Sequence, residues 1–183
     1  MTTGSPERAP LRHGALAGLR VIELAQGIAG PYCGRIFADH GATVVKVEPR
    51  STGDTTRSWG PFPGDRRDLE KSGTFFFLNT DTRRIALDVD VADDRQRLLD
   101  LLREADVLID DSSPRQLQER GLDYATLARL NPKLVMISCT PFGQTGPYAE
   151  WKGYELNAYH LSATGSRYCG LPDREPLATG TFL

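Results

Sequence analysis

A glycine-rich stretch contains the first residues that could do chemistry. Three glycines follow a short apolar run: Gly27, Gly30 and Gly34. Glu48 stands 21 positions after the first of them, at the end of a second apolar run, where dinucleotide-binding proteins use an acid to hold a ribose hydroxyl. The tight Gly-x-Gly-x-x-Gly cradle for a pyrophosphate is missing, however, and Pro31 stands at the start of the following helix. The residues alone favour a simple strand, turn and helix, with Glu48 capping a strand, over NAD binding.

Cys33 is a candidate nucleophile. It lies in the first turn of the same predicted helix, where the helix dipole would lower the pKa of a thiol. No base is identifiable near it in the sequence, and a lone cysteine in an apolar helix more often packs than reacts. The chain has no Cys-x-x-Cys pair and no histidine spacing typical of metal ligands. We therefore expect reduced thiols, a packing role for Cys33 and no metal site.

Residues 152–155, with the sequence Lys-Gly-Tyr-Glu, stand where a loop meets a predicted helix over 154–164. Glu155 could be a charge at the N-terminus of this helix or a catalytic carboxylate. Arg115 and Arg120 could likewise be solvated surface charges or anchors for phosphate groups. Spacing alone does not choose between these roles.

The composition limits the kinds of partner. The 183 residues carry 22 Lys and Arg against 24 Asp and Glu, a net charge of −2, with 25% charged and 39% hydrophobic residues. This balance lacks the basic excess of a nucleic-acid binder, while the many arginines keep small anionic ligands in play. No apolar run approaches the roughly 18 residues that a membrane helix needs, and the N-terminal segment lacks the apolar core of a signal peptide. We therefore expect a cytoplasmic protein that binds neither nucleic acid nor membrane.

Apolar runs alternate with helix-length segments along the chain. Strands are predicted at 19–24, 43–47, 84–89, 107–109 and 134–137, and helices at 30–41, 92–104, 124–130 and 154–164. This order predicts an α/β fold that is Rossmann-like, with a mainly parallel sheet and helices on both faces. Such sheets bind ligands outside the carboxyl ends of their strands.

Three further segments have distinctive compositions. Residues 1–15 lack periodicity and are predicted to be a flexible N-terminal lead-in. Residues 51–73, dense in glycine, proline and charge, are predicted to form a long loop, which in a compact domain is usually functional or mobile. The triple phenylalanine at 75–77 is expected to be core rather than a binding platform.

Five blocks of sequence occur in an order that is more specific than any single motif. They are LAGLRVIELAQGIAGPYCGRIFADHGATVVKVEPRSTGDTTRSWGPF, FFFLNTDTRRIALDV, READVLIDD, LNPKLVMISCTPFGQTGPY and GYELNAYHLSATG. Together they resemble the class III CoA-transferase family, which includes formyl-CoA transferase, carnitine CoA-transferase and 2-methylacyl-CoA racemase. The resemblance spans Leu16 to Leu183 and implies a Rossmann-like, CoA-binding N-terminal portion over 16–183, without the C-terminal half of the family fold. It also implies an interlocked homodimer for the full-length protein.

The resemblance implies a reaction as well. In the transferases an aspartate attacks an acyl-CoA thioester and forms an aspartyl-CoA thioester, from which an incoming carboxylic acid takes the CoA. The segment 176–183 resembles the lead-in to that aspartate, which would follow Leu183, so the 183-residue chain is expected to be inactive by itself. Tyr154 and Glu155 match the transferase form of the motif as supporting catalytic residues, whereas racemases have a basic histidine where Tyr154 stands.

The same resemblance implies which residues bind coenzyme A. They are Arg50, Leu87, Asp111, Arg115, Arg120 and Lys152. The family usually has Asn-Phe-x-Pro-Gly where this chain has Asp111-Ser112-Ser113-Pro114-Arg115, which places a negative charge near a polyanionic ligand. Three alternatives stay open: a non-catalytic CoA- or nucleotide-binding half-protein, a racemase or isomerase of acyl-CoA thioesters, and a fragment of an NAD-dependent oxidoreductase.

Overall fold

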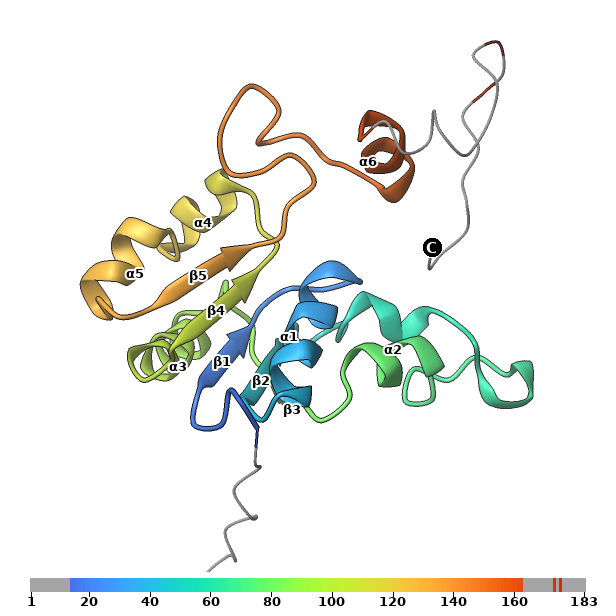
Figure 1. The fold of residues 1–183 in the computed structure, drawn as a ribbon, viewed down its shortest axis with the longest axis horizontal. Helices are drawn as coiled ribbons and strands as arrows, with labels where there is room; N and C mark the ends of the chain where they lie inside the picture. Colours follow the sequence, from blue (N-terminus) through green and yellow to red (C-terminus); the bar gives the residue numbers. More distant parts are fainter. Residues whose placement is uncertain (1–13, 163–172, 174, 176–183) are drawn as a thin grey trace, which may run out of the picture.

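A five-stranded parallel sheet forms the centre of the molecule (Figure 1). The computed structural model describes residues 14–162, 173 and 175. The strands are β1 (Arg20–Glu23), β2 (Thr43–Glu48), β3 (Arg83–Ala86), β4 (Val107–Asp110) and β5 (Val135–Ser138). They lie in the order β3-β2-β1-β4-β5, and every neighbouring pair is parallel. The predicted Rossmann-like sheet is thereby confirmed.

The strand order reverses direction at β1. The chain moves from β1 outward to β2 and β3, then returns to β4 on the other side of β1 and continues to β5. Loops leaving β1 and β4 therefore diverge at the carboxyl edge of the sheet and leave a crevice between them, which is where open α/β sheets bind ligands.

Helices cover both faces of the sheet. They are α1 (Ala29–Asp39), α2 (Gly73–Leu78), α3 (Ala92–Arg103), α4 (Pro114–Arg120) and α5 (Tyr124–Leu130), with 3-10 turns at Thr55–Ser58 and Pro63–Asp65. A further helix, α6 (Glu155–Leu161), lies apart from the sheet (Figure 1). Alternation of side chains along the strands divides the core in two. Val21, Val44 and Ile109 pack on the α1 side, whereas Ile22 and Leu108 pack on the side of α3, α4 and α5.

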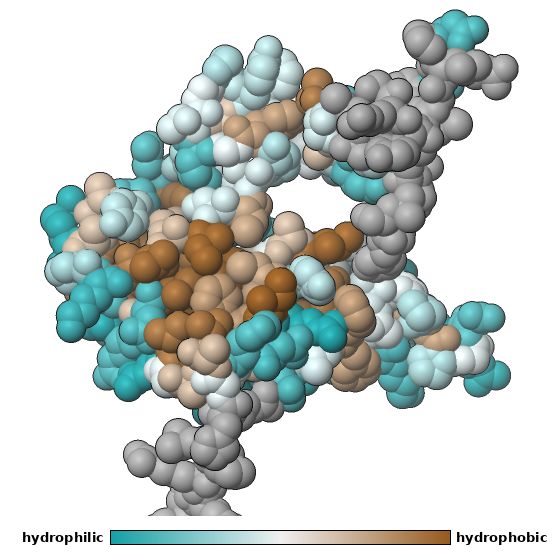
Figure 2. Space-filling view, in the orientation of Figure 1, coloured by the Kyte–Doolittle hydropathy of each residue, from teal (hydrophilic) through white to brown (hydrophobic). Residues whose placement is uncertain are grey.

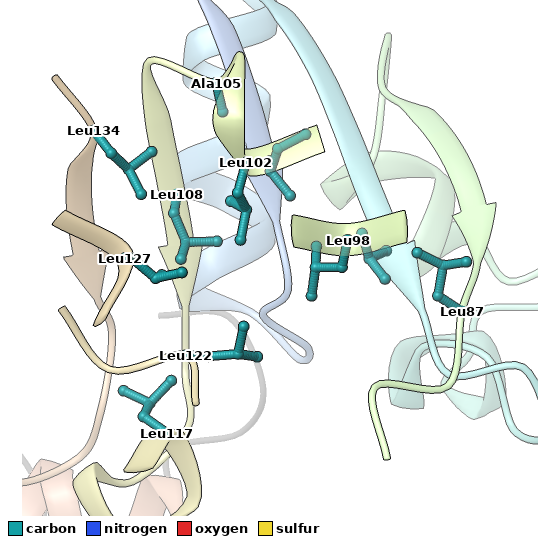
Figure 3. Packing of buried hydrophobic residues seen from close by; sticks show 11 residues of the cluster. Leu87, Leu98, Leu102, Ala105, Leu108, Leu117, Leu122, Leu127 and Leu134 are labelled. Atoms are coloured by element: carbon teal, nitrogen blue, oxygen red, sulfur yellow. The ribbon is translucent and has the colours of Figure 1, made fainter. Parts of the chain in front are cut away.

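The larger half of the core is built mainly from leucine (Figure 3). Leu98 and Leu102 on α3, Leu108 on β4 and Leu127 on α5 are completely buried. Each such side chain contributes about 1.5–3 kcal/mol relative to exposure. This half of the core fixes the helices behind β4 and β5, and with them the loops that leave these two strands.

Polar caps explain where two of the helices begin. Asp123 accepts a hydrogen bond from the Thr126 amide at 3.0 Å, and α5 covers the predicted range of 124–130. The preceding helix, α4, was not predicted. Its signals are present in the sequence as a capping box between Ser113 and Gln116, followed by Gly121 in the left-handed conformation.

The triple phenylalanine differs from the prediction. It lies in α2, and only Phe75 is core, with 2% of its surface exposed, while Phe76 and Phe77 are 54% and 52% exposed. A short surface helix can bury only one of three consecutive side chains, because successive residues point about 100° apart around its axis. The predicted strand over 84–89 is also shorter than expected, as β3, and the helix predicted from 154 begins one residue later, as α6.

Candidate functional site

A cavity of about 970 Å³ opens at the carboxyl ends of β1, β4 and β5. One side is formed by the β1–α1 loop and Trp59, and the other by an arm, residues 139–154, that leads from β5 to α6. Figure 2 shows the corresponding hollow between the body of the molecule and this arm. The volume lies in the range of small-molecule and cofactor sites, and the position is the one predicted for the ligand.

The start of α1 forms the floor of this cavity. Ile28, Ala29 and Gly30 line it, and no side chain caps the helix. A Cβ at Gly30 would lie 2.1 Å from the Ala25 Cβ, and one at Gly34 would lie 2.4 Å from Glu23 Oε2. These two glycines therefore allow α1 to pack closely against β1. The uncapped N-terminus of an 11-residue helix presents N–H groups and positive dipole to the cavity, which suits an anion.

Asp111 connects two of the loops around the cavity. Its Oδ2 accepts a hydrogen bond from the Gln26 amide at 2.8 Å, and both residues line the cavity. Burial raises the pKa of this carboxyl, and only part of that shift is offset by the Gln26 amide and by Lys46. The protonated form of Asp111 is therefore favoured more than in water, which reduces the repulsion that an anionic ligand would meet.

Two predicted cations lie at the cavity. Arg115 and Lys152 both line it. The Arg115 Nε donates to Glu119 Oε1 at 3.0 Å, and the Arg115 amide donates to Glu150 Oε1 at 2.9 Å. Lys152 is exposed and has no ion-pair partner among residues 14–162. A phosphate could therefore bind Lys152 without first breaking an ion pair between this lysine and a carboxylate of residues 14–162.

Both predicted catalytic residues also line the cavity. Tyr154 is 72% exposed and directly precedes α6, and its amide donates to Asn157 Oδ1 at 3.1 Å. Glu155 is an exposed residue in the first turn of this helix. Beside them the arm contains a cluster of three aromatic side chains, Phe142, Tyr148 and Trp151, whose ring centroids lie 4.6–6.4 Å apart.

The other three predicted CoA-binding residues are not among those that line this cavity. Arg50 pairs with Asp94 at 2.7 Å, and Arg120 pairs with Asp90 at 2.9 Å. Leu87 is 6% exposed and belongs to the leucine core. These residues surround the start of α3 instead. Both arginines already have a carboxylate partner. The Asp88 amide and Arg50 hold the pKa of Asp94 below the usual range, and Arg120 does the same for the pKa of Asp90.

The contacts of Glu48 and of Cys33 indicate a structural role for each residue. Arg57 donates to both carboxylate oxygens of Glu48, at 2.6 and 2.9 Å, and these bonds hold the pKa of Glu48 below its usual value despite burial. A carboxylate engaged in this way is not available to a ribose hydroxyl, which counts against the NAD alternative. Burial raises the pKa of the Cys33 thiol, and its side chain packs against the smaller half of the core, as expected for a packing role.

Sequence reasoning missed both tryptophans of the cavity wall, Trp59 and Trp151. Trp151 could have been noticed as the neighbour of Lys152, whereas nothing local to Trp59 marks it.

Three predicted features lie outside the described residues. They are residues 1–13 of the N-terminal lead-in, the end of the predicted helix at 164, and the lead-in to the nucleophile over 176–183. Within 14–162, 173 and 175, no helix is long and apolar enough to cross a bilayer, and no group of three metal-ligating side chains occurs.

Comparison with known proteins identifies the family to which this fold and cavity belong. A sequence model of CoA-transferase family III matches residues 16–183. The chain belongs to CoA-transferase family III.

Individual relatives agree with this assignment. The chain is 41% identical over 183 residues to the succinate–glutarate CoA-transferase of Agrobacterium fabrum, a match that covers 99% of this chain and 44% of the relative. It is 36% identical to the acetyl-CoA:oxalate CoA-transferase of Acetobacter aceti, with 91% of this chain and 41% of the relative covered. A CaiB/BaiF family protein from Brucella suis has a similar structure, with a TM-score of 0.80, 38% identity, and 93% of this chain and 44% of that chain covered. The chain therefore spans less than half the length of these relatives.

Proposed function

We propose that this chain is the CoA-binding, N-terminal part of an enzyme that moves CoA between carboxylic acids. The observation that supports this most is the cavity at the strand-order reversal, because it combines an uncapped helix N-terminus, a lysine without an ion-pair partner among residues 14–162, and exposed aromatic side chains. Acyl-CoA carries phosphates and a thioester, and each has a physically suitable partner among these groups.

The cavity would hold the acyl-thioester end of the ligand. Lys152 would bind a phosphate of CoA, and the α1 N-terminus would stabilise negative charge that develops on the thioester oxygen. Arg50 and Arg120, with the backbone near Leu87, would contact the nucleotide end at the start of α3. Binding there would require phosphate to compete with Asp94 and Asp90 for the two arginines, so these contacts would add less affinity than Lys152 does.

The proposed reaction proceeds through covalent acyl transfer. An aspartate carboxylate, supplied by a residue that follows Leu183, attacks the acyl carbonyl, and the C–S bond breaks to leave a mixed anhydride and CoA thiolate. The thiolate attacks the aspartyl carbonyl and releases the first acid as a carboxylate. The second acid attacks the aspartyl-CoA thioester, the thiolate leaves, and its attack on the new acyl group forms the product thioester and restores the aspartate. Tyr154 and Glu155 would orient the acyl group at the mouth of the cavity.

The assembly and location belong to the same proposal. We infer an interlocked homodimer of the longer polypeptide, acting in the cytoplasm on acyl-CoA and carboxylic acid substrates, without a metal ion. The exposed apolar residues on α1 and α2, Tyr32, Ile36, Phe76 and Phe77, would be covered in that assembly. A racemase is disfavoured because Tyr154 has no basic nitrogen to remove a proton next to the thioester.

Calorimetric titration of the chain with coenzyme A tests the binding part of this proposal. We expect saturable binding, weakened about tenfold by Lys152→Met because one charge-assisted phosphate contact is lost. Lys133→Met is the matched control, since Lys133 is an exposed lysine before β5 at the opposite edge of the sheet, and it should bind as the parent does. Equal binding by the two variants, or binding of NADH in place of CoA, would contradict the proposal.

The catalytic part needs the longer polypeptide. Incubated with succinyl-CoA, it should form a protein thioester that hydroxylamine cleaves, and glutarate should discharge that thioester. The 183-residue chain should bind CoA without forming such a species. Turnover by the 183-residue chain itself would contradict the assignment of the nucleophile to a residue beyond Leu183.

A further inference from the structure

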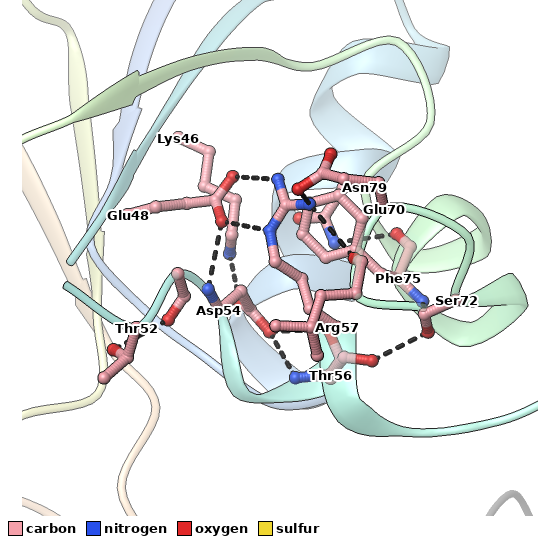
Figure 4. A network of polar contacts seen from close by, with 12 residues as sticks. Lys46, Glu48, Thr52, Asp54, Thr56, Arg57, Glu70, Ser72, Phe75 and Asn79 are labelled. Atoms are coloured by element: carbon pink, nitrogen blue, oxygen red, sulfur yellow. Dashed lines mark hydrogen bonds and ion pairs between the residues drawn. The ribbon is translucent and has the colours of Figure 1, made fainter. Parts of the chain in front are cut away.

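The segment that carries Trp59 is fixed from several directions (Figure 4). The Ser72 hydroxyl lies 2.6 Å from the Trp59 carbonyl oxygen and 2.7 Å from the Thr56 carbonyl oxygen, and its single hydrogen is donated to one of them or shared between them. The Trp59 amide donates to the Thr56 carbonyl at 3.0 Å. The Thr74 hydroxyl donates to the Gly60 carbonyl at 2.5 Å. The backbone from Thr56 to Gly60 is therefore held by Ser72 and Thr74, which lie 13–16 positions further along the chain from the carbonyls that they contact.

Asp54 begins this segment and is itself buried, with 1% of its surface exposed. Its Oδ1 accepts hydrogen bonds from the amide and the hydroxyl of Thr56, at 2.8 and 2.5 Å. Its Oδ2 lies 2.7 Å from the Lys46 Nζ. One carboxylate thus caps the turn that leads to Trp59 and anchors that turn to β2.

Lys46 joins the two segments that form one wall of the cavity. Besides Asp54, its completely buried ammonium group contacts Glu23 Oε1 at 2.6 Å and donates to the Ala25 carbonyl at 2.9 Å. Ala25 directly precedes Gln26, which lines the cavity, and Asp54 leads to Trp59, which lines it from the other loop. The ammonium group therefore sets the distance between the β1–α1 loop and the loop that follows β2.

Stability alone does not explain this arrangement. Removing charges from water costs several kcal/mol per ion, and apolar residues of the same volume are often equally stabilising. Two buried carboxyl groups face one ammonium here, burial raises the pKa of the Glu23 carboxyl, and Glu23 Oε2 has no hydrogen-bond partner among the described residues. Such a group is better explained by the conformation that it imposes on its surroundings.

We propose that Lys46 and Asp54 are positioning residues that hold Trp59 and the Gln26 loop together as one wall of the acyl-CoA cavity. This proposal rests on the proposed function for the identity of the ligand, but the fixed position of Trp59 does not depend on it. Neither residue touches the ligand, and both act through the backbone segments that they anchor.

Tryptophan fluorescence tests the position of Trp59 directly. The chain has two tryptophans, so Trp151→Phe leaves Trp59 as the sole reporter. In that background Asp54→Asn keeps an acceptor for the Thr56 amide but removes the charge that binds Lys46. We expect acrylamide to quench Trp59 at least about twofold more efficiently, and the Kd for coenzyme A to rise about tenfold, because the loop must now be ordered on binding.

Asp123→Asn is the matched control, because Asp123 caps α5 through the same two groups of a threonine, the Thr126 amide and hydroxyl, at 3.0 and 2.8 Å. It should lower the melting temperature without changing the quenching of Trp59.

If Asp54→Asn does not fold, Thr56→Val replaces it, since valine keeps the volume and loses only the hydroxyl contact with Asp54. Unchanged quenching in the folded variant, or an equal change in the Asp123 control, would overturn the proposal. Failure of the chain that retains Trp151 to bind coenzyme A would count against the proposed function, while the quenching comparison would still decide the positioning role.

Discussion

The two sides of the cavity are built in opposite ways. The Trp59 side is anchored to the sheet by side chains that water does not reach, with Lys46 and Asp54 0% and 1% exposed. The arm side presents Trp151 and Tyr154, which are 61% and 72% exposed, and two hydrogen bonds that tie the arm to the rest of the chain, from the Arg115 amide to Glu150 and from Gln144 to the Ser112 carbonyl, are not buried from water. The first wall is organised before a ligand arrives, whereas the second can adjust to it.

This difference suggests a division of labour. A wall that is already ordered costs no conformational entropy on binding and so contributes to affinity and orientation. An exposed arm would accommodate acyl groups of different size. The following substitutions separate the two sides, from the largest expected effect to the smallest.

Lys46→Met should cause the largest loss, about 3–5 kcal/mol in the free energy of unfolding, because it leaves the Glu23 and Asp54 carboxylates buried without a counter-charge. Urea denaturation followed by circular dichroism measures this. A double substitution, Lys46→Met with Asp54→Asn, should recover part of the loss. A loss below about 1 kcal/mol for the single variant would mean that the buried carboxylates are not ionised in the parent.

Asp110→Asn should stabilise the chain at neutral pH. Asp110 is completely buried, its Oδ2 has no partner, and burial raises its pKa to about 6. A folded-state pKa above the ordinary value means that the folded chain binds more protons between about pH 4 and 6, so the free energy of unfolding falls as pH rises through this window. The variant should therefore gain up to about 3 kcal/mol at pH 7 and nothing near pH 3.5. Denaturation at both pH values tests this, and a gain that does not depend on pH would contradict it.

Gly34→Ala should destabilise although alanine is the better helix former. A helix normally gains about 1 kcal/mol from this exchange. Here the new methyl would lie 2.4 Å from the Glu23 carboxylate, which Lys46 holds in place, so a net loss of about 1–2 kcal/mol is expected. Thermal unfolding measures the change, and a higher melting temperature would show that α1 can move away from β1 at little cost.

Arg115→Gln should have the smallest effect on stability, below about 0.5 kcal/mol, because its ion pair with Glu119 joins two exposed side chains on one helix face. The same substitution should increase the Kd for coenzyme A only a few-fold, since Glu119 already competes for this cation. A stability loss comparable to that of Lys46→Met would remove the distinction between the two sides of the cavity.

Local signals were sufficient for much of the fold. Asp123 and the Asn131-Pro132 pair defined α5 to the residue, because caps and prolines act within one turn. The carboxyl-edge location of the cavity followed from the alternation of strands and helices. The helix α4 was not predicted, although Ser113 and Gln116 at its start and Gly121 at its end are a complete set of local signals. It could therefore have been predicted from the sequence.

The fixed wall of the cavity could not be predicted in this way. Trp59 is placed by Ser72 and, through Asp54, by Lys46, and these bonds cross between segments whose approach depends on the finished sheet. The ion pairs of Arg50 and Arg120 with Asp94 and Asp90 are likewise tertiary, so spacing did not reveal that the predicted CoA-binding residues form two groups.

Amide hydrogen exchange with and without coenzyme A tests the central claim most directly, since it reads both walls in one experiment. Peptides covering 54–60 should exchange slowly in either state, whereas peptides covering 149–155 should exchange quickly in the free chain and at least about tenfold more slowly with coenzyme A bound. Fast exchange of peptides covering 54–60 in the free chain would contradict a ligand cavity with one fixed and one adjustable side. So would exchange that coenzyme A slows in neither set of peptides.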